Sequence, residues 1–172
     1  LPDCSNMCHE ASGSALSETL GIGKGSVTLD DLYKAELVMV IGQNPATNHP
    51  RMLSALEKTK QNGGKIIAIN PLPEAGLMKF TDPQSPIKML TGGTKLSDVF
   101  VPVTINGDVA FFKAILLKLL EKEEGIGGVF DKDFINEYTD GYDTFISDLK
   151  TYNFEDSLKA SGVSKEIFDE AF

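Results

Sequence analysis

The chain has 172 residues, of which 41% are hydrophobic and 24% charged, and this composition suits one globular domain. Its formal net charge of -9 argues against a general nucleic-acid binder, because phosphate backbones are held by clustered Lys and Arg. No run approaches the roughly 20 apolar residues that cross a bilayer. Residues 1–20 also lack the basic start and apolar centre of a signal peptide. We therefore expect a cytoplasmic protein with no membrane span in this chain.

The first part of the chain predicts two short helices. Residues 12–20 place Ala, Leu and Thr on one side of a helix, which the glycines that follow would end. Thr28 can cap a second helix that runs to Tyr33.

A strand, a helix and a second strand follow within about 35 residues. Residues 36–42 (ELVMVIG) and 65–71 (KIIAINP) are apolar runs of the kind that form strands buried on both faces. Between them, the apolar side chains after Pro50 lie on one face of a helix, and residues 62–64 (NGG) predict its end. This βαβ pattern predicts a parallel sheet.

The remainder predicts one more strand and a helical C-terminal part. Residues 72–98 read as an irregular connection, and residues 100–105 as the third strand. Asp108 is expected to cap a long helix over 109–124. Short helices are expected over 131–138, 142–151 and 164–172, the last one capped by Ser164. The expected buried face of the long helix consists of Phe112, Ile115, Leu116, Leu119 and Leu120.

Three polar turns follow the three predicted strands, at residues 43–49, 70–72 and 106–108. In open α/β sheets, ligands bind beyond the carboxyl ends of the strands. Free N–H groups in these turns suit a phosphate, and the carboxamides of Asn44, Asn48 and Asn70 can donate to and accept from a base or pterin. The alternative is that Asn, Pro and Gly only form the turns. No Gly-x-Gly-x-x-Gly or Walker lysine motif is present, which disfavours a plain NAD site and a P-loop ATPase.

The sequence has two cysteines, Cys4 and Cys8, close to its start. They can be small buried residues, and with His9 they supply at most three of the four ligands of a structural zinc site. His9 adjoins Cys8, and a basic group there can lower the pKa of a thiol or move a proton. His49 precedes Pro50, where a structural hydrogen bond to a backbone group is the expected role.

Four segments in this order resemble the molybdopterin oxidoreductase family, in its formate dehydrogenase alpha-subunit-like branch. They are CHEASG, AELVMVIGQNPATNHP, NGGKIIAINP and VTINGDVAFFKAIL. The resemblance covers residues 1–150 and, more loosely, the chain to 172. It implies a Rossmann-like three-layer α/β domain with a mainly parallel sheet and C-terminal helices. Residues 1–172 would form a single cofactor-binding domain within a larger catalytic subunit.

The resemblance also implies a cofactor and the residues that hold it. Members bind molybdenum or tungsten through two pterin guanine dinucleotides, a bis(molybdopterin guanine dinucleotide) cofactor. Carried over to this chain, Cys8 is the metal ligand and His9 the adjacent proton-handling residue. A soft thiolate suits a redox metal. The positions that match the family's cofactor-binding turns are Gly42, Gln43, Asn44, Pro45, Thr47, Asn48, Asn70, Gly107 and Asp108.

Two departures from the family leave formate open as the substrate. Glu10 and Ala11 stand where formate dehydrogenases have Gly-Pro, and Leu72 stands where many members have Arg. The family's iron–sulfur segment would lie outside this chain, together with the other domains of the parent subunit. A small-molecule substrate and an electron-transfer partner are the expected partners. The rival hypothesis is a non-catalytic nucleotide-binding α/β domain, like the middle domain of thiamine-dependent enzymes.

The two ends of the sequence favour a piece of a longer polypeptide. The chain starts at Leu1, without an initiator Met, and it stops at Phe172 within the last predicted helix.

Overall fold

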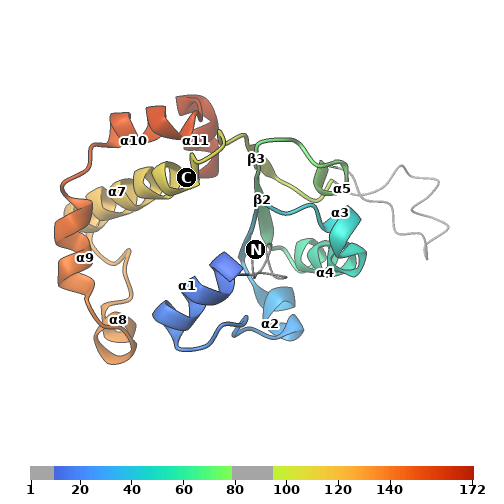
Figure 1. Ribbon diagram of the computed structural model, residues 1–172, viewed down its shortest axis with the longest axis horizontal. Helices are drawn as coiled ribbons and strands as arrows, with labels where there is room; N and C mark the ends of the chain where they lie inside the picture. The colour runs from blue at the N-terminus through green and yellow to red at the C-terminus, as the bar shows by residue number, and fades with distance from the viewer. Residues whose placement is uncertain (1–9, 79–94) are drawn as a thin grey trace, which may run out of the picture.

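Three short parallel strands lie at the centre of the molecule (Figure 1). The structure, a computed structural model, describes residues 10–78 and 95–172. The strands are β1 (Leu37–Ile41), β2 (Lys65–Ile69) and β3 (Val99–Val101), side by side in the order β1-β2-β3. Both neighbouring pairs are parallel, which confirms the predicted α/β class.

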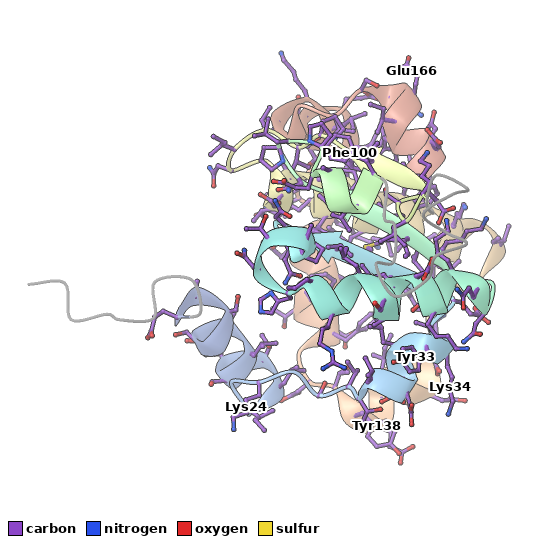
Figure 2. The ribbon with its side chains drawn as sticks, turned by 90° about the vertical axis from the view of Figure 1, so that its right-hand side faces the viewer. Lys24, Tyr33, Lys34, Phe100, Tyr138 and Glu166 are labelled. Atoms are coloured by element: carbon purple, nitrogen blue, oxygen red, sulfur yellow. The ribbon has the colours of Figure 1, made fainter. Side chains whose placement is uncertain are left out.

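Helices surround this sheet and extend to one side of it as a C-terminal helical part (Figure 1). In chain order they are α1 (Glu10–Leu20), α2 (Leu29–Lys34), α3 (Pro45–Asn48), α4 (Pro50–Gln61), α5 (Ala75–Met78), α7 (Asp108–Ile126), α8 (Lys132–Tyr138), α9 (Tyr142–Leu149), α10 (Phe154–Ser161) and α11 (Lys165–Ala171). Helix α1 buries no residue and stands at the edge of the molecule (Figure 2). Within the described ranges, no helix is both long and apolar enough to span a membrane.

One face of the sheet packs on helix α4. Alternate strand residues point to this side, because successive side chains of a strand face opposite ways. Ile66 and Ala68 of β2 are fully buried there, against Leu53 and Leu56 of α4. The predicted apolar face of the helix therefore forms as expected.

The opposite face packs on the C-terminal helices. Ile67 and Ile69 of β2 point to this side and meet Phe111 of α7 and Phe168 of α11. The rings of Phe111 and Phe168 meet edge to face with centroids 6.1 Å apart, and both side chains are almost completely buried. Helices thus cover both faces of the sheet, which is the three-layer arrangement.

Helix α7 buries a face rotated from the predicted one. Phe111 and Ala114 are fully buried, whereas the predicted Phe112, Leu116 and Leu119 are only half-buried. The rotation arises because Phe111 fills the space between the sheet and α11. Ile115 and Leu120 are buried as predicted.

Helices α3, α5 and α10 are not predicted by apolar periodicity. The first two have only four residues each. Helix α10 buries Ser157 and Ser161 together with Leu158. Because two of these three buried positions hold serine, the sequence shows no apolar periodicity that would predict the helix. Its N-cap is Asn153, whose side chain accepts from the Asp156 N–H.

The predicted caps form at α2 and α11. Thr28 and Asp31 make a reciprocal capping box at the start of α2, and Ser164 Oγ accepts from the Ile167 N–H at the start of α11. The hydrogen bonds from Thr28 to Asp31 lower the pKa of that carboxyl group.

The end of α7 is held by one buried carboxylate. Glu123 Oε2 accepts from the N–H groups of Val129 and Phe130 at 2.7 and 3.1 Å, and Oε1 lies 2.6 Å from Lys132 Nζ. These contacts lower the Glu123 pKa to about 2, and the contact with Lys132 has the largest effect. The carboxylate therefore ties the chain after α7 back onto the helix.

Candidate functional site

The three strands end in one row, and the three predicted turns begin from it. Ile41 pairs with Ile69, and Ile69 with Val101, so the last residues of the strands are neighbours across the sheet. The ladder continues by one bond on each side, from the Gly42 N–H to the Ile69 carbonyl and from the Asn70 N–H to the Val101 carbonyl. The structure thus brings the starts of the turns after β1, β2 and β3 to one edge of the sheet.

The turn after β1, residues 42–49, reverses direction at Gly42, whose φ of +62° favours glycine. Asn44 then caps α3, because its Oδ1 accepts from the Thr47 N–H at 3.3 Å. Pro45 is buried, whereas Thr47 and Asn48 are exposed. The N–H groups of Gln43, Asn44 and Ala46 have no hydrogen-bond partner in the described parts of the chain. Within the described residues, the turn therefore presents unpaired donors at the sheet edge.

Among the described residues, the ring of His49 contacts a side chain instead of the expected backbone group. Its Nδ1 lies 3.0 Å from Gln43 Nε2, which joins the two ends of the turn through their side chains. Gln43 is half-buried and reaches across because the short α3 brings residue 49 back beside it. The role remains structural, but the partner is a carboxamide.

Glu74 is a site residue that sequence reasoning missed. Its Oε2 accepts from Asn44 Nδ2 at 2.6 Å, a contact between residues 30 positions apart that ties the turn after β1 to the chain after β2. Both groups of the Asn44 side chain are therefore engaged within the protein, so Asn44 positions the turn. No local sequence motif identifies Glu74, because its partner Asn44 is distant in sequence and comes close only in the folded chain.

The turn after β2 is open to solvent. Asn70 is half-buried, and its backbone N–H extends the ladder to β3. Leu72, at the position of the family's arginine, is 69% exposed.

The turn after β3 is built by close packing. Asn106 has a positive φ of 68°, and Gly107 is the N-cap of α7, so the prediction that Asp108 caps this helix is wrong. Asp108 is the first helical residue instead, where its negative charge suits the positive end of the helix dipole. The N–H groups of Asp108, Val109 and Ala110 have no hydrogen-bond partner in the described ranges. As far as the described residues go, this turn also presents unpaired donors.

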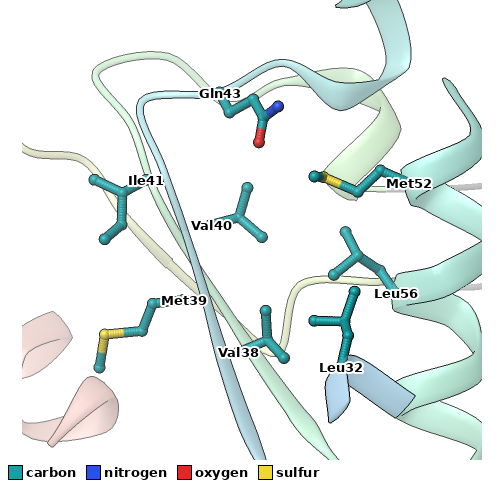
Figure 3. A pocket seen from close by; sticks show the side chains of 8 residues that line it. All are labelled: Leu32, Val38, Met39, Val40, Ile41, Gln43, Met52 and Leu56. Atoms are coloured by element: carbon teal, nitrogen blue, oxygen red, sulfur yellow. The ribbon is translucent and has the colours of Figure 1, made fainter. Parts of the chain in front are cut away.

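Two hollows border the turns. One of about 300 Å³ lies along β1, reaches Gln43 and is otherwise apolar (Figure 3). The other, of about 480 Å³, lies beside Asn106 between α7 and α10 and is lined in part by Lys113, Tyr152 and Asp156. Lys113 Nζ lies 3.2 Å from the centroid of the Tyr152 ring.

The predicted metal ligand Cys8 and its neighbour His9 lie outside the described residues. Over residues 10–78 and 95–172, no group of three or more His, Cys, Asp and Glu is placed to hold a metal ion. The described chain begins at Glu10 with helix α1.

Known proteins resemble the chain over almost its whole length. An uncharacterized oxidoreductase of Mycobacterium tuberculosis is 48% identical over 164 residues, which are 95% of this chain and 21% of that protein. A formate dehydrogenase alpha subunit of Methanocaldococcus jannaschii is 26% identical over 171 residues, 99% of this chain and 22% of that protein. The solved structure of acetylene hydratase from Pelobacter acetylenicus superimposes with a TM-score of 0.67, at 15% identity, over 96% of this chain and 19% of that one. No family model matches.

These likenesses agree with the predicted resemblance to a segment of the molybdopterin oxidoreductase family. Two formate dehydrogenase alpha subunits are 26% identical to the chain, in line with the branch that the ordered motifs predict. The chain spans about a fifth of the length of the relatives it matches. The likeness to acetylene hydratase supports the fold alone.

Proposed function

We propose that this chain is a cofactor-binding domain of a molybdopterin-dependent oxidoreductase that resembles formate dehydrogenase. In this proposal the turns after β1, β2 and β3 hold a molybdopterin guanine dinucleotide, and Cys8 ligates molybdenum or tungsten. One observation carries it: the turns that match the family's cofactor-binding motifs start from one row at the carboxyl edge of the sheet.

The chemistry of the described turns fits such a ligand. The N–H groups after β1 and at the start of α7 that have no partner among the described residues can donate to a pyrophosphate. The carboxylate of Asp108 and the carboxamides of Asn48 and Asn70 can pair with the N–H and O groups of a guanine or pterin ring. Gly42 is exposed and lacks a side chain, so a ligand can approach the backbone there.

Each residue has a separate role in this proposal. When bound, the cofactor supplies a metal centre that exchanges two electrons with a substrate. Cys8 would hold the metal as a thiolate, and His9 would accept or deliver the substrate's proton. Asn44 and Glu74 would keep the first turn in place, since their side chains bond each other.

The complete enzyme requires the rest of the parent polypeptide. Metal affinity depends on a full and supported ligand shell, and this segment spans only about a fifth of its relatives. We expect residues 1–172 in isolation to carry no stoichiometric metal. The parent would supply the remaining cofactor contacts, an iron–sulfur cluster where one exists, the substrate pocket and the surface for an electron-transfer partner.

The first test is elemental and nucleotide analysis of the full-length parent, made in a host that synthesises the cofactor. The proposal predicts about one molybdenum or tungsten and about two guanine nucleotides per chain, as the family resemblance implies. Protein with neither metal nor guanine would favour the rival, a non-catalytic nucleotide-binding domain.

A Cys8→Ser variant of the parent then tests the metal ligand. Because the hydroxyl is a harder and weaker ligand than a thiolate, we expect turnover to fall sharply while the circular dichroism spectrum stays unchanged. Unchanged turnover would refute Cys8 as the ligand. Formate is the first substrate to assay.

A further inference from the structure

The negative charge of the chain is concentrated in its C-terminal helical part. Of the 25 acidic and 16 basic residues in the sequence, 15 acidic and 7 basic residues lie in 105–172, so this part carries -8 of the net charge of -9. Residues 131–149, which comprise α8, α9 and the turn between them, are named the α8–α9 segment. It contains one lysine and six exposed carboxylates, those of Asp131, Asp133, Glu137, Asp140, Asp143 and Asp148.

The α8–α9 segment also carries large apolar side chains that the described protein leaves uncovered. Phe134 and Tyr138 of α8 are 54% and 66% exposed, and their ring centroids lie 5.1 Å apart. Phe145 of α9 is 47% exposed, and Tyr138 lies at the margin of the molecule (Figure 2). In the described structure, α8 buries no residue and α9 buries only Leu149. Neighbouring aromatic side chains that are left exposed indicate an interaction surface.

Contacts at the base of the α8–α9 segment hold this surface in place. The Glu123 carboxylate of α7 accepts from the N–H groups of Val129 and Phe130. It also contacts Lys132, the first residue of α8. The Phe130 ring meets Tyr142 of α9 edge to face, with centroids 6.3 Å apart. Because helices this short are marginal in water on their own, these contacts order the segment in advance, and a preformed surface loses less conformational entropy on binding.

We propose that the α8–α9 segment is the docking surface for a separate protein whose own surface combines Lys and Arg with apolar side chains. Carboxylates that flank exposed aromatic rings favour such a partner, because complementary charges speed association and suppress wrong partners. A second copy of the chain would bring two acidic surfaces together, which disfavours it. The segment is shorter than the roughly 20–30 residues that each side of a stable interface provides, so a transient complex is expected. This inference does not depend on the proposed cofactor.

The two kinds of side chain have separate roles in the docking. Phe134 and Tyr138 would be covered by apolar side chains of the partner and would supply most of the affinity, as buried aromatic residues do in other interfaces. The carboxylates would lie around them, where charge sets the association rate and the dependence on salt.

Photo-cross-linking of the full-length parent, in the organism that encodes it, tests the docking. With the photoreactive p-benzoylphenylalanine in place of Tyr138, we expect an adduct with a different protein, whose cross-linked peptide contains Lys or Arg beside apolar residues. The Kd of that protein for the parent, measured with both purified, should rise at least about tenfold from low to physiological salt. Cross-links only within the parent, an adduct of two parent copies, an acidic cross-linked peptide or no adduct would overturn the proposal.

Two pairs of charge reversals separate docking at this surface from attraction to the total charge. Glu137→Lys with Asp148→Lys should raise the Kd at least about tenfold, and Glu18→Lys with Glu170→Lys less than about twofold. All four carboxylates are exposed and lie in the last turn of a helix, where Lys suits the helix dipole, so both variants should fold. Equal effects of the two pairs would overturn the proposal.

A Phe134→Ala variant tests the apolar part of the surface. We expect it to raise the Kd at least about fivefold, because truncation of a central aromatic residue weakens an interface. Since α8 buries no residue in the described structure, the variant should keep its circular dichroism spectrum. An unchanged Kd would show that charge alone drives the association and would overturn the proposed surface.

Discussion

The turns after β1 and β3 match two motifs of the same family but are built in opposite ways. Side chains hold the first: Gln43 meets His49, and Asn44 meets Glu74. The second is held through one backbone carbonyl, since both the N–H and the side-chain Oγ1 of Thr104 donate to the Ser161 carbonyl.

This difference separates what each turn can do. The first turn is open, and its conformation depends on polar contacts that a ligand or a variant can change. The second is closed by the α10–α11 corner, where a Cβ on Gly162 would lie 2.2 Å from Thr104 Cγ2. A Cβ on Gly107 would also meet this corner, 2.7 Å from the Ser161 carbonyl oxygen, so Gly107 has a structural reason to be glycine, whether or not its backbone also approaches a cofactor.

The largest effect expected from this comparison is that of Gly107→Ala. The φ of Gly107 is -88°, which alanine adopts freely, but a Cβ would lie 2.7 Å from the Ser161 carbonyl oxygen and 2.8 Å from Thr104 Oγ1. Overpacking of this kind costs about 1–3 kcal/mol of unfolding free energy. Urea unfolding followed by circular dichroism measures it.

Gly125→Ala is the matched control for that variant. Gly125 lies in α7, and a Cβ there would meet nothing within 4 Å. Alanine should raise stability by up to about 1 kcal/mol, because glycine is a poor helix former. Equal effects of the two variants would mean that the contact with Ser161 is not tight in solution.

The strands were predictable from the sequence because burial on both faces leaves a strong mark. ELVMVIG and KIIAINP contain β1 and β2, and each strand is only two residues shorter than its run. The third strand is shorter than predicted, Val99–Val101 instead of 100–105, because Thr104 leaves the sheet to bond Ser161. That partner lies 57 residues away, so no local pattern could reveal it.

The candidate site was predictable in its location but not in its internal contacts. The rule that ligands bind at the carboxyl ends of strands placed the turns correctly, since their position follows from strand direction alone. It could not identify Glu74, which acts through Asn44 across a distance in sequence of 30 residues. Cys8 and His9 stay predictions, as do the cofactor contacts assigned to the turns.

A smaller effect is expected at the open turn, from Glu74→Ala. The change leaves the half-buried Asn44 Nδ2 without its acceptor, which costs about 1 kcal/mol of stability. If the turn holds the guanine dinucleotide, the parent should also lose bound guanine nucleotide faster on dilution. Nucleotide release measured by chromatography tests this expectation.

Two variants serve as controls for Glu74. Glu74→Gln keeps an oxygen that can accept from Asn44, so it should retain most of the nucleotide. Glu137→Ala removes an exposed carboxylate on α8 and should change neither property. If Glu74→Ala lowers stability but does not speed nucleotide release, the contact supports the fold of the turn, and the proposed binding of the cofactor by this turn is contradicted.

The smallest effect is expected where α7 ends, in a contact that combines features of both turns: a charged side chain, as at Glu74, that is sealed from solvent, as at Gly107. Glu123 is 6% exposed, and its contacts with Lys132, Phe130 and Val129 lower its pKa from 4.5 to about 2. A carboxyl group with a lowered folded-state pKa stabilises the fold above its unfolded value of 4.5 and loses this contribution as the pH falls toward 2. Stability should therefore decline through this window in the wild type.

Lys132→Met removes the largest cause of the lowered Glu123 pKa, so the stability of this variant should begin to decline at a higher pH. Glu123→Gln has no carboxyl group to protonate at this position, so its stability should decline least relative to its own value at neutral pH. Urea midpoints measured across the window test the order, and three identical pH profiles would show that this carboxylate does not stabilise the fold.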